Sequence, residues 1–301
     1  MNTLYKLKIV FAYYVSENFT KFHKWHLINF NNMLLNNLDN DYFNDINFYL
    51  LIDDVNNEEL INKTKNDILS YISNNFIIKF HIVQNNPNYR EGLIYKTEII
   101  DKFDQYDEDQ LILFMHTKGV SNNLNLENYE NTLYWIGIMY YFNLLNVYSI
   151  FEKFYNENII TYGTIYNYDD SSLTKYKWQY TGSFHWIYPY KFLNYLKDNN
   201  LSYDNLKHKY NSNTFIKYCA EAFIGDNIET KYAGFLDDHL FNKNCSHFLY
   251  DNSNLPYSNI TYVCTELMHP NNYDRFLYYL IDLKNNGNYD EITNDIQFLH
   301  S

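Results

Sequence analysis

The sequence predicts a doubly wound α/β fold, with a mostly parallel sheet flanked by helices. Three observations lead to this prediction: short apolar runs that do not alternate with polar residues, longer stretches with apolar residues at helical spacing, and the regular alternation of the two. Continuous apolar runs are typical of strands buried on both faces. Strands that alternate with helices are typical of parallel sheets.

The predicted elements follow in order from the first residues. The run KIVFAYY predicts a strand over residues 8–14, and the amphipathic stretch after it predicts a helix over residues 18–38. Further strands are predicted over residues 47–52, 77–83 and 111–115. Further helices are predicted over residues 58–74, 91–104, 215–224 and 273–284. We expect residues 1–235 to form one domain and residues 236–301 to form a C-terminal extension. The last helix would pack back on the domain or join two copies as a homodimer.

Composition argues against several classes of protein. The 301-residue chain has a net charge of −13, a pI near 5.1 and no Lys/Arg-rich run, which argues against a nucleic-acid-binding protein. Its three cysteines, Cys219, Cys245 and Cys264, suggest neither a disulfide framework nor a zinc site, and they fit a reducing compartment. No apolar window reaches the roughly 18 residues of a membrane span. We therefore expect a soluble, cytoplasmic protein.

Polar residues follow four predicted strands at their carboxyl ends. They are Tyr13 and Tyr14, Asp53 and Asp54, the loop of residues 85–90 with Arg90, and His116 with Lys118. Ligands of open α/β sheets bind at this edge, near the point where the strand order reverses. The first strand is not followed by G-x-G-x-x-G, and the chain contains no G-x-x-x-x-G-K-[ST]. These absences argue against a dinucleotide site and a P-loop.

His116 and Lys118 stand two residues apart at the end of the fourth predicted strand, in LILFMHTKG. Side chains at this spacing point to the same side of an extended chain, about 6–7 Å apart. Two such donors suit the adjacent phosphates of a diphosphate, because lysine carries a compact positive charge and histidine can donate or shuttle a proton. In the alternative interpretation, His116 caps the strand through backbone hydrogen bonds and Lys118 is solvated.

Several motifs together resemble a family of GT-A-type glycosyltransferases found in bacteria and large DNA viruses. HTKG at residues 116–119 and AEAFIG at residues 220–225 match well, and NYREGLIYKTEI resembles the helix before HTKG, with Glu91 at its acidic position. GSFHW, residues 182–186, departs from the G-N-F-W-W-like pattern at Ser183 and His185. Trp135 lacks the arginine that usually follows it. The resemblance runs from about residue 6 to residue 230.

This resemblance implies a GT-A-like domain that transfers a sugar from a nucleotide-sugar donor to a glycan, a glycoprotein or another hydroxyl acceptor. A UDP-sugar is the first expectation for the donor, a hexose or deoxyhexose for the sugar, and inversion for the stereochemistry. Polysaccharide biosynthesis is the implied setting. Three alternatives stay open: a retaining transferase, a non-catalytic nucleotide- or glycan-binding protein of the same fold, and a nucleotidyltransferase.

Two carboxylates are candidates for the base of this reaction. Glu221 lies among apolar residues of a predicted helix, where its pKa would be raised toward the range of a general base. Asp226 is the second candidate, and His116 would meet the leaving group. In the alternative, Glu221 is a solvated helix residue.

The GSFHW segment is expected to bind the sugars. Gly182 would allow a ligand close to the backbone. Phe184, His185 and Trp186 would form an aromatic floor for an acceptor sugar, with core packing as the alternative.

The remaining donor contacts are expected from the second strand and the first. Asp53 and Asp54 would bind a ribose or base, or would close the strand in an Asx turn. Tyr13 and Tyr14 could stack on the base, although a chain with 34 tyrosines gives this little weight.

No metal site is predicted with assigned ligands. The D-x-D segment at residues 107–109 precedes the fourth strand, at the wrong end of the sheet for a metal-bound diphosphate. Mn²⁺ or Mg²⁺ held by Asp53, Asp169 or Asp170 stays open, and His269 is a further candidate for a diphosphate contact.

Overall fold

The structure is a computed structural model that describes residues 5–17, 21–72, 76–117, 136–137, 139–141, 143–144, 147–167 and 178–234. Its strands are β1 (Lys6–Tyr14), β2 (Phe43–Ile52), β3 (Ile78–Gln84), β4 (Gln110–His116), β5 (Thr161–Asn167), β6 (Trp178–Ile187) and β7 (Ala233–Gly234). Its helices are α1 (Lys21–Asn29), α2 (Glu58–Tyr71), α3 (Glu91–Glu98), α5 (Val147–Asn156), α6 (Pro189–Asp198), α7 (Tyr203–Lys209) and α8 (Asn213–Asn227). The expected C-terminal extension, with the helix over residues 273–284, lies outside the described residues.

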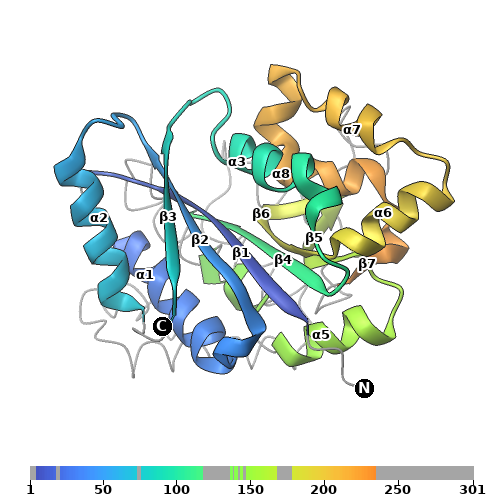
Figure 1. Ribbon diagram of the computed structural model, residues 1–301, viewed down its shortest axis with the longest axis horizontal. Helices are drawn as coiled ribbons and strands as arrows, with labels where there is room; N and C mark the ends of the chain where they lie inside the picture. Colours follow the sequence, from blue (N-terminus) through green and yellow to red (C-terminus); the bar gives the residue numbers. More distant parts are fainter. Residues whose placement is uncertain are drawn as a thin grey trace, which may run out of the picture.

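The strands form one mixed, mostly parallel sheet in the order β3-β2-β1-β4-β6-β5-β7, as Figure 1 shows. β1 to β4 are parallel to one another, whereas β6 runs antiparallel to β4 and β5. The predicted α/β class with a mostly parallel sheet is therefore confirmed. The order of strands reverses between β1 and β4, because β2 and β3 lie on one side of β1 and β4 lies on the other. Open α/β sheets bind their ligands at such a reversal.

Two cores cover the two faces of the sheet. Phe11 and Tyr13 of β1 and Met115 of β4 point to the side of α1, α2 and α5, which we call the α1/α2 face. Ala12 of β1 and Phe114 of β4 point to the side of α3, α6 and α8, which we call the α3/α8 face. Figure 1 shows these two groups of helices on opposite sides of the sheet. Successive residues of a strand alternate between faces, so both faces of these strands are buried.

The predicted helices that the structure describes are found, but two of them end earlier than predicted, and no bounds were predicted for α5, α6 and α7. α3 ends at Glu98 and not at residue 104, and a 3-10 helix over Ile100–Gln105 follows it. α2 begins as predicted because Asn57 caps it, accepting a hydrogen bond from the Leu60 amide at 3.1 Å. α1 ends at Asn29 and continues as a π-helical turn, Phe30–Leu34, instead of running as one helix to residue 38. Asparagine side chains bond to backbone carbonyls here: Asn29 donates to Trp25 O and Asn37 donates to Met33 O. Such bonds compete with regular helical geometry.

β6 was not predicted as a strand, and it carries an irregularity beside β4. Its register against β5 shifts between Gly163 and Ile165, so that residues 181–184 bulge. Ser183 lies in this bulge with φ 51°, a left-handed conformation that is uncommon for serine. Gly182 precedes it. Bulges of this kind occur often next to functional sites.

Candidate functional site

The carboxyl ends of β1 and β4 are joined where the strand order reverses. Thr117 Oγ1 accepts a hydrogen bond from the Tyr14 amide at 2.9 Å, and the Thr117 amide donates to Ala12 O at 3.1 Å. Thr117 is buried, so these bonds are shielded from water. They fix the place of His116, the last residue of β4, beside Ala12 of β1.

Three polar side chains form a network over the ends of β1, β2 and β3. The Tyr14 hydroxyl donates to Asp53 Oδ2 at 3.3 Å, and Asn85 Nδ2 donates to Asp53 Oδ1 at 2.7 Å. The pKa of Tyr14 is raised, mainly by burial and then by the Asp53 carboxylate. Asp53 is exposed, so its carboxylate can exchange these partners for the hydroxyls of a ligand.

His116 faces a carboxylate from the first turn of α3. Its Nε2 lies 3.9 Å from Oε1 of Glu91, and the imidazole side chain is 9% exposed. By strand alternation His116 lies on the α3/α8 face, the same face as Tyr14. The predicted histidine therefore lies at the reversal point of the sheet, with an acidic partner.

Arg90, the residue before α3, has a strained backbone. Its φ of 47° and ψ of −138° fall in a region that residues other than glycine rarely occupy, and its side chain is exposed. Such conformations cost of order 1–3 kcal/mol, and they persist where the surrounding structure requires them. The strain belongs to the turn that places Arg90 and Glu91 at the edge of the sheet.

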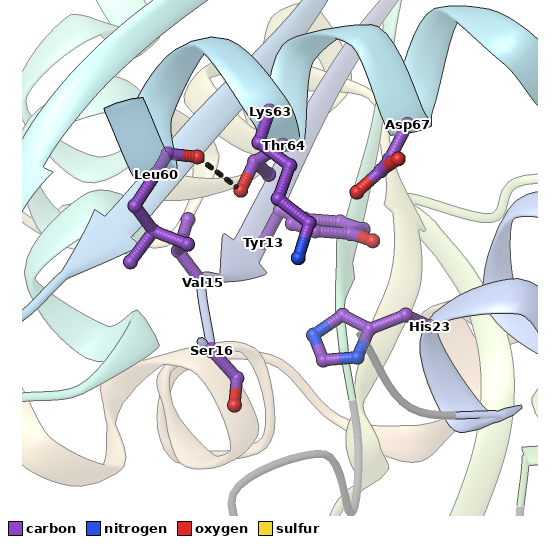
Figure 2. A pocket seen from close by; sticks show the side chains of 8 residues that line it. All are labelled: Tyr13, Val15, Ser16, His23, Leu60, Lys63, Thr64 and Asp67. Atoms are coloured by element: carbon purple, nitrogen blue, oxygen red, sulfur yellow. Dashed lines mark hydrogen bonds between the residues drawn. The ribbon is translucent and has the colours of Figure 1, made fainter. Parts of the chain in front are cut away.

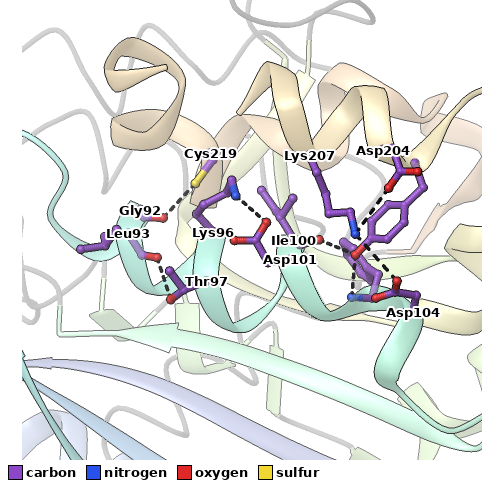
Figure 3. Close-up of polar contacts among 12 residues, drawn as sticks. Gly92, Leu93, Lys96, Thr97, Ile100, Asp101, Asp104, Asp204, Lys207 and Cys219 are labelled. Atoms are coloured by element: carbon purple, nitrogen blue, oxygen red, sulfur yellow. Dashed lines mark hydrogen bonds and ion pairs between the residues drawn. The ribbon is translucent and has the colours of Figure 1, made fainter. Parts of the chain in front are cut away.

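Helix α8 packs onto α3 close to this edge. The Cys219 thiol donates to Gly92 O at 3.1 Å, as Figure 3 shows. The pKa of Cys219 is raised, chiefly by burial and then by the Glu91 carboxylate, which places that carboxylate near α8 as well. At Gly225 a Cβ would lie 1.7 Å from the Trp178 carbonyl oxygen, so α8 touches the backbone of β6 there. Glu221 precedes Gly225 by one turn and shares its side of the helix. It is half-buried.

Polar contacts at the other end of α3 hold the helices of this face together. The Tyr203 hydroxyl of α7 donates to Ile100 O at 2.6 Å and accepts from the Phe103 amide at 2.9 Å. Lys207 lies 3.7 Å from Asp104 and 3.6 Å from Asp204, as Figure 3 shows. Lys96 pairs with Asp101. These contacts hold α7 against the end of α3 and the turn after it. They do not reach the carboxyl ends of the strands.

Asp226 does not suit the predicted role of second base. Its carboxylate pairs with Lys209 and accepts a hydrogen bond from the Tyr210 hydroxyl at 2.8 Å, and the residue is 6% exposed. With both partners in place and the residue buried, the carboxylate is not presented to an acceptor hydroxyl. Asp226 instead ties α8 to the end of α7.

Phe184, His185 and Trp186 do not form the expected aromatic floor. Alternation along β6 sends Phe184 and Trp186 to the α1/α2 face and His185 toward the α3/α8 face, and all three are fully buried. His185 Nε2 lies 3.0 Å from the Tyr95 hydroxyl, and the imidazole stacks on Tyr180 at 4.6 Å. Burial lowers the pKa of His185 to about 3. Core packing, the alternative interpretation, describes these residues.

Tyr13 also lies away from the site, on the α1/α2 face. It lines a hollow whose other side chains are shown in Figure 2, with Lys63 and Asp67 from α2 and His23 from α1. The empty space of the hollow is about 220 Å³ when the open solvent at its mouth is included. No part of this space is wide enough to hold a water molecule. A base cannot stack on Tyr13 in this hollow. Tyr14, not Tyr13, belongs to the strand-end network.

Of the other predicted residues, Asp54 and Gly182 are described by the structure and the rest are not. Asp54 closes an Asx turn, accepting from the Asn56 amide at 2.9 Å, as the alternative interpretation stated. Gly182 lies in β6 next to the bulged Ser183. The remainder lie outside the described residues: Lys118, Trp135, Asp169, Asp170 and His269.

Within the part of the chain that the structure describes, no group of three or more His, Cys, Asp or Glu side chains is arranged to hold a metal ion. Of the three aspartates considered for Mn²⁺ or Mg²⁺, Asp53 bonds to Tyr14 and Asn85, and Asp169 and Asp170 lie outside the described residues, so a site made from them stays a prediction. Likewise, none of the described helices is long and apolar enough to cross a membrane.

Comparison with known proteins adds no relative: the sequence matches no protein-family model and none of the curated proteins.

Sequence reasoning missed the partners that organise the site. Asn85, Thr117 and Glu91 contact predicted residues, yet none of the three was assigned a role from its position alone. Thr117 follows His116 at the end of β4, and its hydroxyl ties β4 to β1. The strand-end position of Asn85, equivalent to that of Asp53, was the signal that could have found it.

Proposed function

We propose that the edge formed by the ends of β1, β2 and β4 binds a nucleotide-sugar donor, and that the protein is a glycosyltransferase of GT-A type. The observation that carries the proposal is the grouping of Tyr14, Asp53 and His116 on one face at the reversal point of the sheet. Ligands of open α/β sheets bind there. The HTKG and AEAFIG motifs add the class of reaction, since they resemble those of glycosyltransferases.

Each group has a role that its chemistry supports. Asp53 accepts hydrogen bonds from the ribose or base of the donor. His116, with Lys118 two residues on, provides positive charge for a diphosphate, which a chain with a net charge of −13 must concentrate locally. Charge on the leaving diphosphate grows in the transition state, so fixed cations at this edge lower the barrier. Glu221, on the side of α8 that faces β6, is the proposed base for the acceptor hydroxyl.

Donor binding is tested by thermal stabilisation with UDP-, GDP-, dTDP- and CMP-sugars, followed by calorimetry with and without EDTA. A bound ligand raises the melting temperature by mass action. We expect one nucleotide series to stabilise the protein and Lys118→Ala to weaken its binding about ten- to a hundredfold, the effect of losing one charge-assisted hydrogen bond. If no nucleotide changes the melting temperature, the proposal fails. Binding that disappears with EDTA and ignores Lys118→Ala would instead require a metal.

Turnover is tested with Glu221→Gln, using as the control Glu229→Gln, whose carboxylate follows α8 and pairs with Lys231 at 2.9 Å. Removing a base should abolish transfer while donor affinity stays within a few-fold of wild type. The control should keep both. Equal loss of affinity and turnover in Glu221→Gln would assign the residue to binding or folding.

A non-catalytic nucleotide- or glycan-binding protein is the second candidate. The burial of Phe184, His185 and Trp186 favours it, because these rings do not provide the expected acceptor surface. A protein that binds a nucleotide sugar tightly but neither transfers nor hydrolyses it, whatever hydroxyl acceptor is supplied, would support this candidate over the transferase.

A further inference from the structure

β3 is the last strand on one side of the sheet, and among the described strands only β2 pairs with it. Figure 1 shows β3 beside α2, at the margin of the sheet. Its register against β2 runs from Ile78 to Gln84 without a shift, so the strand is regular along its whole length. A regular edge strand presents a row of backbone N–H and C=O groups that can pair with a further strand.

The direction of these backbone groups follows from the hydrogen bonds on either side of β2. The Asn85 amide donates to Ile52 O at 2.8 Å, so the backbone of Asn85 faces β2. On the other side of β2, the Val15 amide donates to Leu51 O at 2.8 Å, which agrees with this alternation. Backbone groups alternate between the two sides of a strand, so the odd-numbered residues of β3 face β2 as Asn85 does. The residues whose backbone faces outward are then Ile78, Phe80, Ile82 and Gln84.

β3 carries few of the features that protect exposed edges from pairing. Its sequence, IKFHIVQ, contains no proline or glycine, and its one lysine, Lys79, pairs with Asp45 of β2. Ile82 is 38% exposed, and Ile77, directly before the strand, is 84% exposed. Short segments with high β-propensity, low net charge and no proline pair readily with strands of other chains.

We propose that the outer edge of β3 binds β3 of a second copy of this chain, antiparallel, about a two-fold axis at His81. Hydrogen-bonded pairs must join outward-facing residues, and the register centred on His81 uses all four of them. Ile78 then pairs with Gln84 of the second copy and Phe80 with Ile82 of the second copy, each twice by symmetry. Phe80 and Ile82 form an aromatic–aliphatic pair on the α1/α2 face, where the ring of Phe80 already packs on the core.

Charge favours a second copy at this edge over other parts of the surface. With a net charge of −13, two copies of the chain repel each other over much of their surface. In the proposed register Lys79 lies opposite Val83 of the second copy, so no like charges face each other. The two His81 side chains meet at the axis, and partial burial lowers the pKa of His81, which keeps both neutral near neutral pH. Because the contact is short, we expect a weak dimer, with a dissociation constant on the order of micromolar or above.

The register is tested by cysteine cross-linking of the full chain. At the axis, the two residues at position 81 form a non-hydrogen-bonded pair with Cα atoms about 4.5 Å apart, within the range that a disulfide bridges. His81→Cys should therefore give a disulfide-linked dimer under mild oxidation. Lys79→Cys is the matched control, because Lys79 is exposed on the same face of β3 but would lie about 13 Å along the strand from its counterpart. Wild type gives the background from the three native cysteines. Equal cross-linking of the two variants overturns the inference.

The dimer itself is tested by sedimentation velocity over a concentration series that spans the micromolar range. Ile82→Lys should weaken association about tenfold, because it removes an apolar pair twice by symmetry. Leu201→Lys, after α6 and 37% exposed, is the control of matched exposure and should associate as wild type does. If Ile82→Lys does not fold, the cross-linking variants decide alone.

Two results of this series contradict the proposal. A chain that stays monomeric throughout overturns it. A dimer that Ile82→Lys does not weaken also overturns it, and would place the contact elsewhere, as in the predicted helix over residues 273–284. Neither measurement needs a nucleotide, so the inference stands or falls independently of the proposed function.

Discussion

Tyr13 and Tyr14 are neighbours in the chain, yet their hydroxyl groups belong to different regions of the molecule. Tyr14 points to the α3/α8 face and donates to the exposed Asp53. Tyr13 points to the α1/α2 face, where its ring is fully buried and its hydroxyl has no hydrogen-bond partner among the described residues. Burial raises the pKa of Tyr13 well above its ordinary value, with Asp67 adding to the effect. One strand end thus serves a polar edge on one side and a closed core on the other.

The polar side chains at the carboxyl edge of this sheet therefore lie on one of its two faces. His116, Glu91 and Asp53 gather on the α3/α8 face, while the hollow on the α1/α2 face is too narrow for a nucleotide. Matched residues on the two faces therefore provide internal controls. Substitutions on one face should change binding, and their counterparts on the other should change stability alone.

The largest expected effect compares the buried histidines of the two faces, His185 and His23, in acid. Burial lowers the pKa of His185 to about 3, below its ordinary value of 6.5, so the unfolded chain binds a proton at a higher pH than the folded chain does. Its contribution to stability is therefore lost as the pH falls from 6.5 toward 3, by roughly 2 kcal/mol at about pH 5. Chemical denaturation of wild type and His185→Phe should show a stability difference that shrinks between about pH 7.5 and pH 5.

His23 on the α1/α2 face gives the control for this prediction. Burial also lowers its pKa, but the Tyr14 carbonyl, 3.0 Å from Nε2, opposes the change. We expect a smaller change with pH for His23→Phe. A stability difference for His185→Phe that is the same at both pH values would contradict the burial of a neutral His185.

The second effect compares two aspartates, Asp53 at the end of β2 and Asp67 on α2. Asp53→Ala removes the acceptor at the centre of the strand-end network and should weaken nucleotide binding about tenfold. Asp67→Ala lies beside the hollow on the opposite face and should leave the affinity within twofold, while altering stability. Calorimetry with the stabilising nucleotide measures both. Equal losses of affinity would show that the two faces do not act separately.

The third effect uses the two tyrosines themselves. Tyr13→Phe removes a buried hydroxyl that has no partner among the described residues, and it should raise the free energy of unfolding by about 1 kcal/mol. Tyr14→Phe removes a long hydrogen bond near solvent, so it should change stability little and weaken nucleotide binding a few-fold. Denaturant titration measures the free energy of unfolding of each variant, and calorimetry measures its affinity for the nucleotide. Weaker nucleotide binding by Tyr13→Phe would place Tyr13 in the site after all.

The smallest effect compares two residues with left-handed backbones, Arg90 at the proposed site and Asn200 away from it. Arg90→Gly relieves the left-handed backbone before α3 and should raise the free energy of unfolding by about 0.5–1 kcal/mol, while weakening nucleotide binding through loss of the exposed guanidinium. Asn200→Gly, with φ 55° after α6, should gain only a few tenths of a kcal/mol and bind normally, because asparagine tolerates this conformation. Arg90→Gly that loses stability would show that the turn needs its side chain.

The sequence predicted those parts of the fold that depend on local pattern. Continuous apolar runs located β1 to β4, and because parallel strands end at one edge, the pattern placed His116 and Asp53 together without any knowledge of the loops. β6 escaped prediction because its residues, WQYTGSFHWI, combine a bulge with polar residues that are buried by neighbours distant in the sequence. The prediction that Phe184, His185 and Trp186 bind the acceptor failed because the segment was not recognised as a strand. In a strand, adjacent side chains point to opposite faces, so the three rings cannot form one surface.

The site was predicted in part, because side-chain partners depend on tertiary packing. Asp226 resembled a base in sequence, but α7 brings Lys209 and Tyr210 onto its carboxylate. Conversely, Glu91 of α3 and His116 of β4 lie on two different elements. Neither helical nor strand periodicity relates their positions, so the sequence alone could not predict their contact. Lys118 stays a prediction, since it lies outside the described residues.

The pairing of β1 with β4 also dictates when the site can exist during folding. β1, β2 and β3 pair with one another within the first 84 residues, whereas the bond from Tyr14 to Thr117 joins residues 103 positions apart. Closing that longer loop costs more chain entropy, and contacts of long range slow folding. A chain emerging from the ribosome can form its first three strands with α2 before β4 has been synthesised. Asp53 is then in place long before His116 arrives, so a nascent or truncated chain presents the β2 half of this edge without the β4 half.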